Sequence, residues 1–131
     1  LISDYIDIVF ANEGEARAFT GSFDSQEQVR HIAHLCDLAV VKLGENGSVA
    51  MMEGGRIYQC NALPVSEVVD TTAAGDYFAA GFLHALTSGH RLKKCLQVGT
   101  ILATEAVQVV GAELPPSAWN RIKSTIHCRK I

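Results

Sequence analysis

Two short apolar runs constrain most strongly what this chain can fold into. Residues 6–11 (IDIVFA) and 38–43 (LAVVKL) are rich in β-branched and aliphatic side chains, and each has the length of one buried strand. Stretches with the apolar spacing of helices lie between and after them, so single buried strands alternate with helices. This alternation predicts a layered α/β sheet that is partly parallel.

Capping residues set the expected limits of the first two helices. Asn12 stands where a helix N-cap is expected, with acidic residues in the following turn, and Gly21 ends that helix. Ser25 is expected to cap a second helix that runs to about Cys36. The other elements expected are a hairpin of strands 48–53 and 56–62, and helices at about 75–88, 92–110 and 117–128.

The composition excludes several classes of protein. The chain has 131 residues, 48% of them hydrophobic and 19% charged, which fits one globular domain. Its net charge of −3 and the lack of a dense basic stripe argue against a nucleic-acid partner, and no apolar run has the length of a membrane span. Four cysteines without a CxxC pair are expected to be reduced thiols of a cytoplasmic protein. His31 and His34 are interpreted as surface residues of a helix.

The most informative stretch for chemistry is residues 70–76, DTTAAGD, which leads into an expected helix. Small residues at a helix start let backbone N–H groups approach an anion closely, and the helix dipole favours a phosphate there. Ala73, Ala74 and Gly75 are therefore expected to surround a phosphoryl group. Asp76 follows in the first turn, where a carboxylate either stabilises the helix or acts as a general base toward an attacking hydroxyl. Gly81, one turn on, is expected to allow tight packing on the sheet.

This stretch resembles the carboxy-terminal signature of PfkB/ribokinase-type carbohydrate kinases, D-T-x-G-A-G-D-x-F-x-x-G. The departure is Ala73, where the family usually has glycine, and alanine is harmless there if its φ is negative. The resemblance implies a three-layer, ribokinase-like (Rossmann-like) α/β sheet with helices on both faces. The residues that match are Asp70, Thr71, Ala74, Gly75, Asp76, Phe78 and Gly81.

Two upstream motifs occur in the order that the same family shows. Asn12 and Glu15 resemble its N-x-x-E motif and imply support for magnesium and phosphate, the carboxylate acting through water. On its own this pattern reads as an N-cap with a solvated glutamate. Lys42, Gly44 and Gly47 resemble the strand-to-turn element that lies against ATP, although a plain β-turn would have the same sequence.

The resemblance also implies contacts further along the chain. Thr71 is assigned to the nucleotide site, and the segment from Thr100 to Gly111 resembles the helix and loop that bracket the adenine. Asp70, with neighbouring backbone carbonyls, resembles a monovalent-cation site, potassium in some members. The implied cofactors are therefore ATP, Mg²⁺ and, in part of the family, K⁺.

The resemblance spans residues 6–131 and matches only the carboxy-terminal, nucleotide-binding and catalytic part of such a kinase. The substrate-binding and lid part that precedes it in the family has no counterpart, and the sequence starts without methionine. We therefore expect a partial fold that forms homo-oligomers or associates with a missing amino-terminal half, and that is weakly active or inactive alone.

Three functions are weighed on the sequence. The first is ATP-dependent phosphoryl transfer to a sugar or nucleoside hydroxyl, in an adenosine-kinase-like or ribokinase-like member. The second is a non-catalytic nucleotide-binding or assembly module derived from such a kinase. The third is an unrelated α/β domain that shares a helix-capping pattern.

Overall fold

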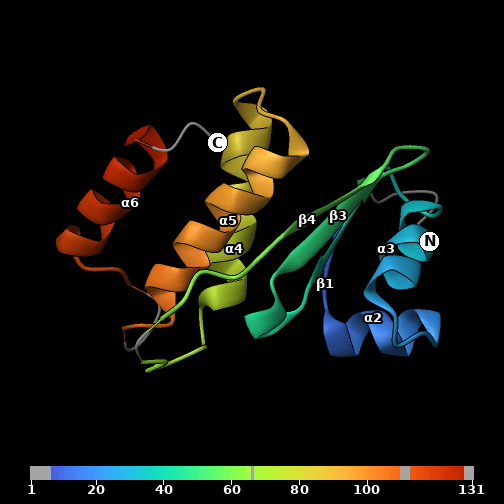
Figure 1. Cartoon of the computed structure of the whole chain (residues 1–131), viewed down its shortest axis with the longest axis horizontal. Helices are drawn as coiled ribbons and strands as arrows, with labels where there is room; N and C mark the ends of the chain where they lie inside the picture. The colour runs from blue at the N-terminus through green and yellow to red at the C-terminus, as the bar shows by residue number, and fades with distance from the viewer. Residues whose placement is uncertain (1–6, 66, 110–112, 129–131) are drawn as a thin grey trace. The chain divides into compact units, whose positions relative to one another are not determined.

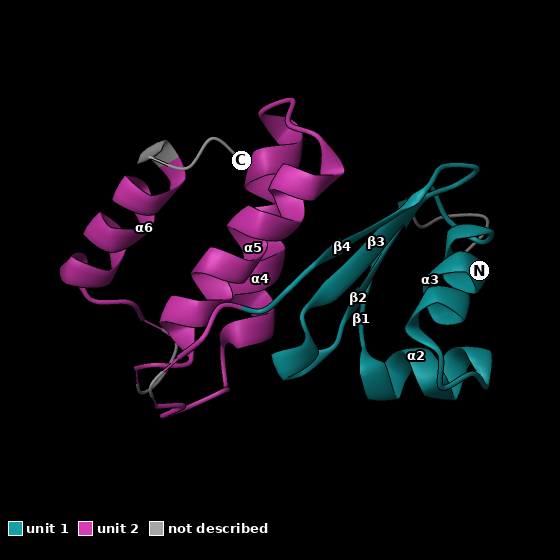
Figure 2. Ribbon diagram, in the orientation of Figure 1, with its two compact units in different colours: residues 1–62 teal, residues 63–131 magenta. Residues whose placement is uncertain are grey.

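The computed structural model of the chain describes residues 7–65, 67–109 and 113–128. They form two compact units, residues 1–62 and residues 63–131, coloured separately in Figure 2. The first unit holds all the strands of the described residues, and the second is helical (Figure 1). Among the described residues, none of the helices combines the length and the apolar character required to span a lipid bilayer.

The first unit is a four-stranded sheet with two helices on one face. The strands have the order β1-β2-β3-β4; β1 and β2 are parallel, and the two later pairs are antiparallel. Helices α2 and α3 connect β1 to β2 and pack on the same side of the sheet (Figure 1). The elements are β1 Ile8–Asn12, α2 Glu13–Thr20, α3 Ser25–Ala33, β2 Leu38–Lys42, a 3-10 turn Gly44–Asn46, β3 Ser48–Met52 and β4 Ile57–Cys60.

Alternation along the strands gives this sheet two apolar faces. Residues of all four strands pack with α2 and α3, around the buried Ala16, Val29 and Ile32. The opposite face carries Phe10 and Val40, and a sheet that is apolar on both sides is typical of the inner layer of a fold. The strand residues on the helix-covered face are Val9, Ala11, Ala39, Val41, Val49, Met51 and Ile57.

Two limits of α3 differ from the sequence prediction. Asp24, and not Ser25, is the N-cap, because its carboxylate accepts a hydrogen bond of 2.9 Å from the Gln26 amide. The helix ends at Ala33 and not near Cys36, since the Leu35 amide bonds back only three residues, to Ile32. Asp24 and Ser25 are both residue types that cap helices, and the earlier of the two is the N-cap here.

The second unit packs three helices: α4 Ala74–Thr87, α5 Leu92–Ala106 and α6 Pro116–Cys128. Helices α4 and α5 lie against each other, and α6 packs on α5 (Figure 1). A Cβ on Gly81 would lie 3.0 Å from the Val98 carbonyl oxygen, and one on Gly99 would lie 2.8 Å from that of Phe78. A close approach at Gly81 therefore occurs against α5.

The ends of α5 and α6 also depart from expectation. The helix predicted to reach Val110 ends at Ala106, because amides 108 and 109 bond only three residues back and the Val107 carbonyl accepts from Val69 and Asp70. Helix α6 begins at Pro116 and not after Ser117; proline suits the first position of a helix, where its missing N–H costs nothing. Residue 110 lies outside the described part of the chain.

Candidate functional site

The start of α4 presents backbone amides that the protein leaves open. Ala73 is the N-cap, and no side chain caps this helix. The Ala74 amide bonds to the Thr71 carbonyl at 3.3 Å, whereas the amides of Ala73, Gly75 and Asp76 have no hydrogen-bond partner among the described residues. An uncapped helix start with free N–H donors is a favourable place for an anion. Of the three residues expected around a phosphoryl group, two therefore have available amides.

Ala73 adopts a backbone conformation that alanine tolerates. Its φ is −106° and its ψ is 2°, and no residue other than glycine has a positive φ in the described part of the chain. The replacement of the usual glycine by Ala73 therefore introduces no backbone strain. The residue is buried, at 5% exposure.

The carboxylate of Asp76 lies in the first turn of α4 and is exposed. It forms no hydrogen bond or ion pair with other described residues. A carboxylate that is open to solvent and one turn from unpaired amides is free to approach a hydroxyl bound nearby. This is the position expected for a general base, and it also stabilises the helix start through the dipole.

The loop before α4 is held in shape by hydrogen bonds to the side chain of Asp70, the first residue of the DTTAAGD stretch. One oxygen of Asp70 accepts from the Thr72 amide at 2.9 Å and also from the Thr72 hydroxyl. The Val69 and Asp70 amides donate to the Val107 carbonyl at 2.7 and 3.1 Å. Asp70 therefore shapes the loop that ends at Ala73, and its backbone is bonded to the end of α5.

A second group of predicted residues meets at the carboxyl ends of β1 and β2 in the first unit. Asn12 of β1 lies opposite Lys42 of β2 in the parallel pair, and Lys42 lies opposite Ser48 of β3 in the antiparallel pair. Ligands of open α/β sheets commonly bind at this edge, beyond the carboxyl ends of parallel strands. The sheet thus brings Asn12, Glu15, Lys42 and Gly44 to one edge.

Asn12 and Glu15 form a reciprocal capping box at the start of α2. The Glu15 amide donates to Asn12 Oδ1 at 2.8 Å, and the Asn12 amide donates to Glu15 Oε1 at 2.9 Å. The N-cap predicted at Asn12 is confirmed. Glu15 Oε2 has no hydrogen bond to other described residues, so this oxygen remains able to accept from the water shell of a cation, whereas the remaining terminal atom of Asn12 is Nδ2, a donor.

The two glycines of the turn after β2 have different roles. Gly44 has a φ of 60°, and a Cβ there would meet nothing within 4 Å, so its backbone is open to a ligand. Gly47 is buried with a φ of 91°, and a Cβ would lie 2.0 Å from the Cys60 carbonyl oxygen. The packing of the neighbouring strands therefore requires glycine at position 47, independently of any ligand contact.

The predicted site residues fall into two sets, one in each unit. Thr71 is exposed in the second unit and its carbonyl accepts from the Ala74 amide. Gly111 lies outside the described residues. Sequence reasoning missed two positions: the Val107 carbonyl, for which no sequence signal exists, and Ser48, whose buried hydroxyl has no partner among the described residues.

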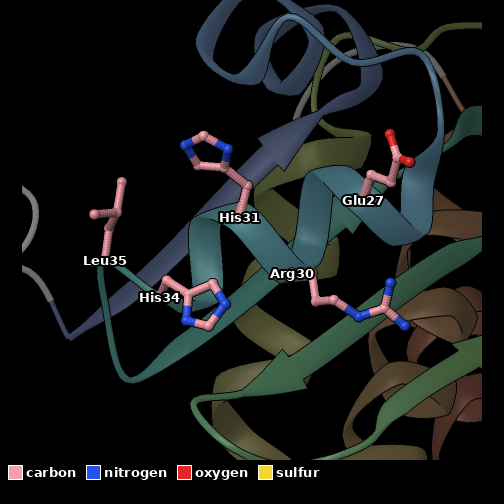
Figure 3. A pocket seen from close by; sticks show the side chains of 5 residues that line it. All are labelled: Glu27, Arg30, His31, His34 and Leu35. Atoms are coloured by element: carbon pink, nitrogen blue, oxygen red, sulfur yellow. The ribbon is translucent and has the colours of Figure 1, made fainter.

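A surface pocket of about 380 Å³ lies on α3 and contains none of the predicted site residues. Glu27 and His31 point to one side of the helix, whereas Arg30 and His34 point to the other (Figure 3). The His31 ring packs edge-on to Phe19 at 6.1 Å, and the described residues contain no cluster suited to a metal ion. Ligand sites need converging polar groups, so this pocket is not a candidate site.

Comparison with known proteins shows the family. The model described as "pfkB family carbohydrate kinase" matches residues 1–119. A ribokinase of Arabidopsis thaliana is 36% identical over 115 residues, which are 83% of this chain and 30% of the relative. This chain therefore spans about a third of the length of the curated relatives it matches.

Solved structures confirm the predicted ribokinase-like α/β fold. The adenosine kinase of Sinorhizobium meliloti has a TM-score of 0.84 and 36% identity, covering 92% of this chain and 36% of that one. An Arabidopsis thaliana ribokinase, solved with ribose and ATP, has a TM-score of 0.79 and 34% identity, covering 92% and 42%. The third hypothesis, an unrelated α/β domain, is wrong. The chain belongs to the pfkB family of carbohydrate kinases.

Proposed function

We propose that this chain forms the nucleotide-binding and catalytic part of a kinase that phosphorylates a hydroxyl of a sugar or nucleoside with ATP. The observation that carries the proposal is the uncapped start of α4, where the amides of Ala73, Gly75 and Asp76 are open beside the exposed Asp76 carboxylate. A relative solved with ribose and ATP supports the choice of ligands.

In the proposed reaction, a substrate hydroxyl attacks the γ-phosphorus of ATP. The new bond joins the hydroxyl oxygen to phosphorus, the bond to the β-phosphate oxygen breaks, and ADP leaves. Asp76 receives the hydroxyl proton, while the open amides of α4 stabilise the charge on the transferred group. Lys42, whose side chain is half-buried at the end of β2, would contact a phosphate as a point charge.

The edge formed by Asn12 and Glu15 fits a hydrated magnesium ion. The described residues hold no group of three or more acidic, histidine or cysteine ligands, and magnesium commonly keeps several waters beside one or two protein oxygens. When bound, the ion neutralises charge on the phosphates. The loop that contains Asp70 would hold the monovalent cation that the family resemblance implies.

We further propose that substrate contacts and a lid belong to an amino-terminal part outside these 131 residues. The chain spans about a third of its relatives, and phosphoryl transfer depends largely on positioning. The isolated chain is therefore expected to bind Mg-ATP and to turn over weakly or not at all. We propose that the chain associates with that amino-terminal part, which would supply these contacts, or forms a homo-oligomer, which would not. The alternative function is a nucleotide-binding or assembly module that needs no turnover.

Substitution of Asp76 tests the proposal. In a protein that also contains the amino-terminal part, we expect Asp76→Asn to lower kcat by about 10²- to 10⁴-fold, with Mg-ATP affinity nearly unchanged. Steady-state kinetics over a panel of sugars and nucleosides, with isothermal titration of Mg-ATP, measures both. Asp24→Asn, which keeps the cap of α3, serves as the control for loss of one exposed carboxylate. Equal kcat in D76N and D24N would count against the role of Asp76.

A further inference from the structure

Glu105 is a buried carboxylate that the proposed mechanism does not use. It lies in the last turn of α5, and the residue is only 9% exposed. A buried carboxylate loses its hydration, and the carboxyl end of a helix carries partial negative charge that opposes a second anion. Both effects make Glu105 dependent on a cationic partner.

That partner is Arg121 on α6, sixteen residues further along the chain. Arg121 Nε lies 2.6 Å from Glu105 Oε1, and Nη2 donates to Oε2 at 3.2 Å. The hydrogen bond and the negative charge of Glu105 raise the pKa of Arg121 above its usual value, so the guanidinium stays charged. This two-point pair joins α6 to the end of α5.

The same end of α5 is bonded to the loop that carries the open amides. Val107, two residues after Glu105, accepts hydrogen bonds through its carbonyl from the Val69 and Asp70 amides. Asp70 in turn holds the Thr72 amide, one residue before the N-cap Ala73. Polar contacts, joined by short backbone steps from Glu105 to Val107 and from Thr72 to Ala73, therefore lead from Arg121 to the start of α4, entirely within the second unit.

We propose that Arg121 is a positioning residue of the phosphate site, acting through Glu105 and the end of α5. This inference rests on the function proposed above. Without Arg121, whose side chain is 58% exposed, the Glu105 carboxylate loses its cationic partner, and its charge favours movement of the last turn of α5 toward water. Such a movement displaces the Val107 carbonyl and loosens the loop before Ala73, so the amides of Ala73 and Gly75 lose their fixed direction.

Titration of Mg-ATP into the 131-residue chain and its variants tests the inference. Arg121→Gln is expected to weaken binding by about tenfold, and Arg121→Lys, which keeps the charge but not the two-point geometry, by a smaller factor. The double variant E105Q/R121Q is expected to recover affinity, because no unpaired charge remains. Lys123→Gln removes one exposed positive charge from the same helix and is expected to bind as the unsubstituted chain.

Hydrogen exchange separates positioning from simple loss of stability. At a temperature where circular dichroism shows every variant folded, the Val69 and Asp70 amides are expected to exchange faster in R121Q than in K123Q. Equal Mg-ATP affinity of R121Q and K123Q would overturn the role of Arg121. Should R121Q fail to fold, affinity of R121K equal to that of K123Q would do the same. Absence of Mg-ATP binding by the unsubstituted chain would instead overturn the proposed function.

Discussion

At the scale of single residues, the turn after β2 combines one glycine that the packing requires with one whose surroundings are open. Gly44 and Gly47 both have positive φ, at 60° and 91°. They differ in surroundings: the position of a Cβ is empty at Gly44, whereas at Gly47 it would overlap the Cys60 carbonyl. The backbone around Gly47 must therefore shift before any side chain fits.

Alanine substitutions at these two glycines separate strain from overlap. Gly44→Ala is expected to cost about 1–2 kcal/mol, the penalty of the left-handed conformation alone. Gly47→Ala adds a backbone overlap and is expected to cost about 3 kcal/mol or more. Urea unfolding followed by circular dichroism measures both, with Gly44→Ala as the matched control. Similar costs would contradict the overlap at Gly47.

At the scale of elements, the crossing of α4 and α5 is set by two glycines that face the other helix. The backbones approach so closely at Gly99 that a Cβ would lie 2.8 Å from the Phe78 carbonyl oxygen. Phe78 and Phe82 stack on α4 with their ring centres 6.3 Å apart, and both are buried. The crossing therefore fixes the helix that carries Asp76.

Gly99→Ala is expected to lower the free energy of unfolding by about 2 kcal/mol, because overlap outweighs the gain in helix propensity. Gly14→Ala is the matched control: it lies in α2, where the nearest atom to a Cβ is 3.5 Å away. There we expect a gain of about 0.5–1 kcal/mol. Thermal and urea unfolding of both variants checks the opposite signs, and a stabilising Gly99→Ala would contradict the close crossing.

Sequence patterns predicted elements well where local chemistry decides, and less well where distant contacts do. The capping box of Asn12 and Glu15 spans four consecutive residues, and its N-cap was predicted. The end of α5 was missed because Val107 is bonded to Val69 and Asp70, nearly forty residues earlier. The small side chain of Gly81 predicts a close approach, but the sequence does not indicate that a residue of α5 is what approaches it.

At the scale of the whole molecule, both units contain a buried thiol. Cys36 lies at 6% exposure in the first unit, and its Sγ contacts the Ile32 and Leu38 carbonyls at 3.3 and 3.4 Å. Cys95 is fully buried in the second unit. Burial raises the pKa of both thiols above the usual 9.0 by removing water from the charged form. Alkaline pH therefore acts on both units through the same chemistry.

Because the folded state holds these protons more tightly than the unfolded chain, both thiols contribute stability below about pH 9. This contribution is lost as the pH rises from 9 toward the raised pKa values of the folded state. The loss is at most about 1.4 kcal/mol for each thiol and each pH unit. We expect urea unfolding to show a drop in stability between pH 8 and pH 10 that is smaller in C36A/C95A. Comparing each protein with itself at the two pH values cancels the cost of the cavities that the substitutions leave. An equal drop in the two proteins would mean that other groups cause the alkaline loss.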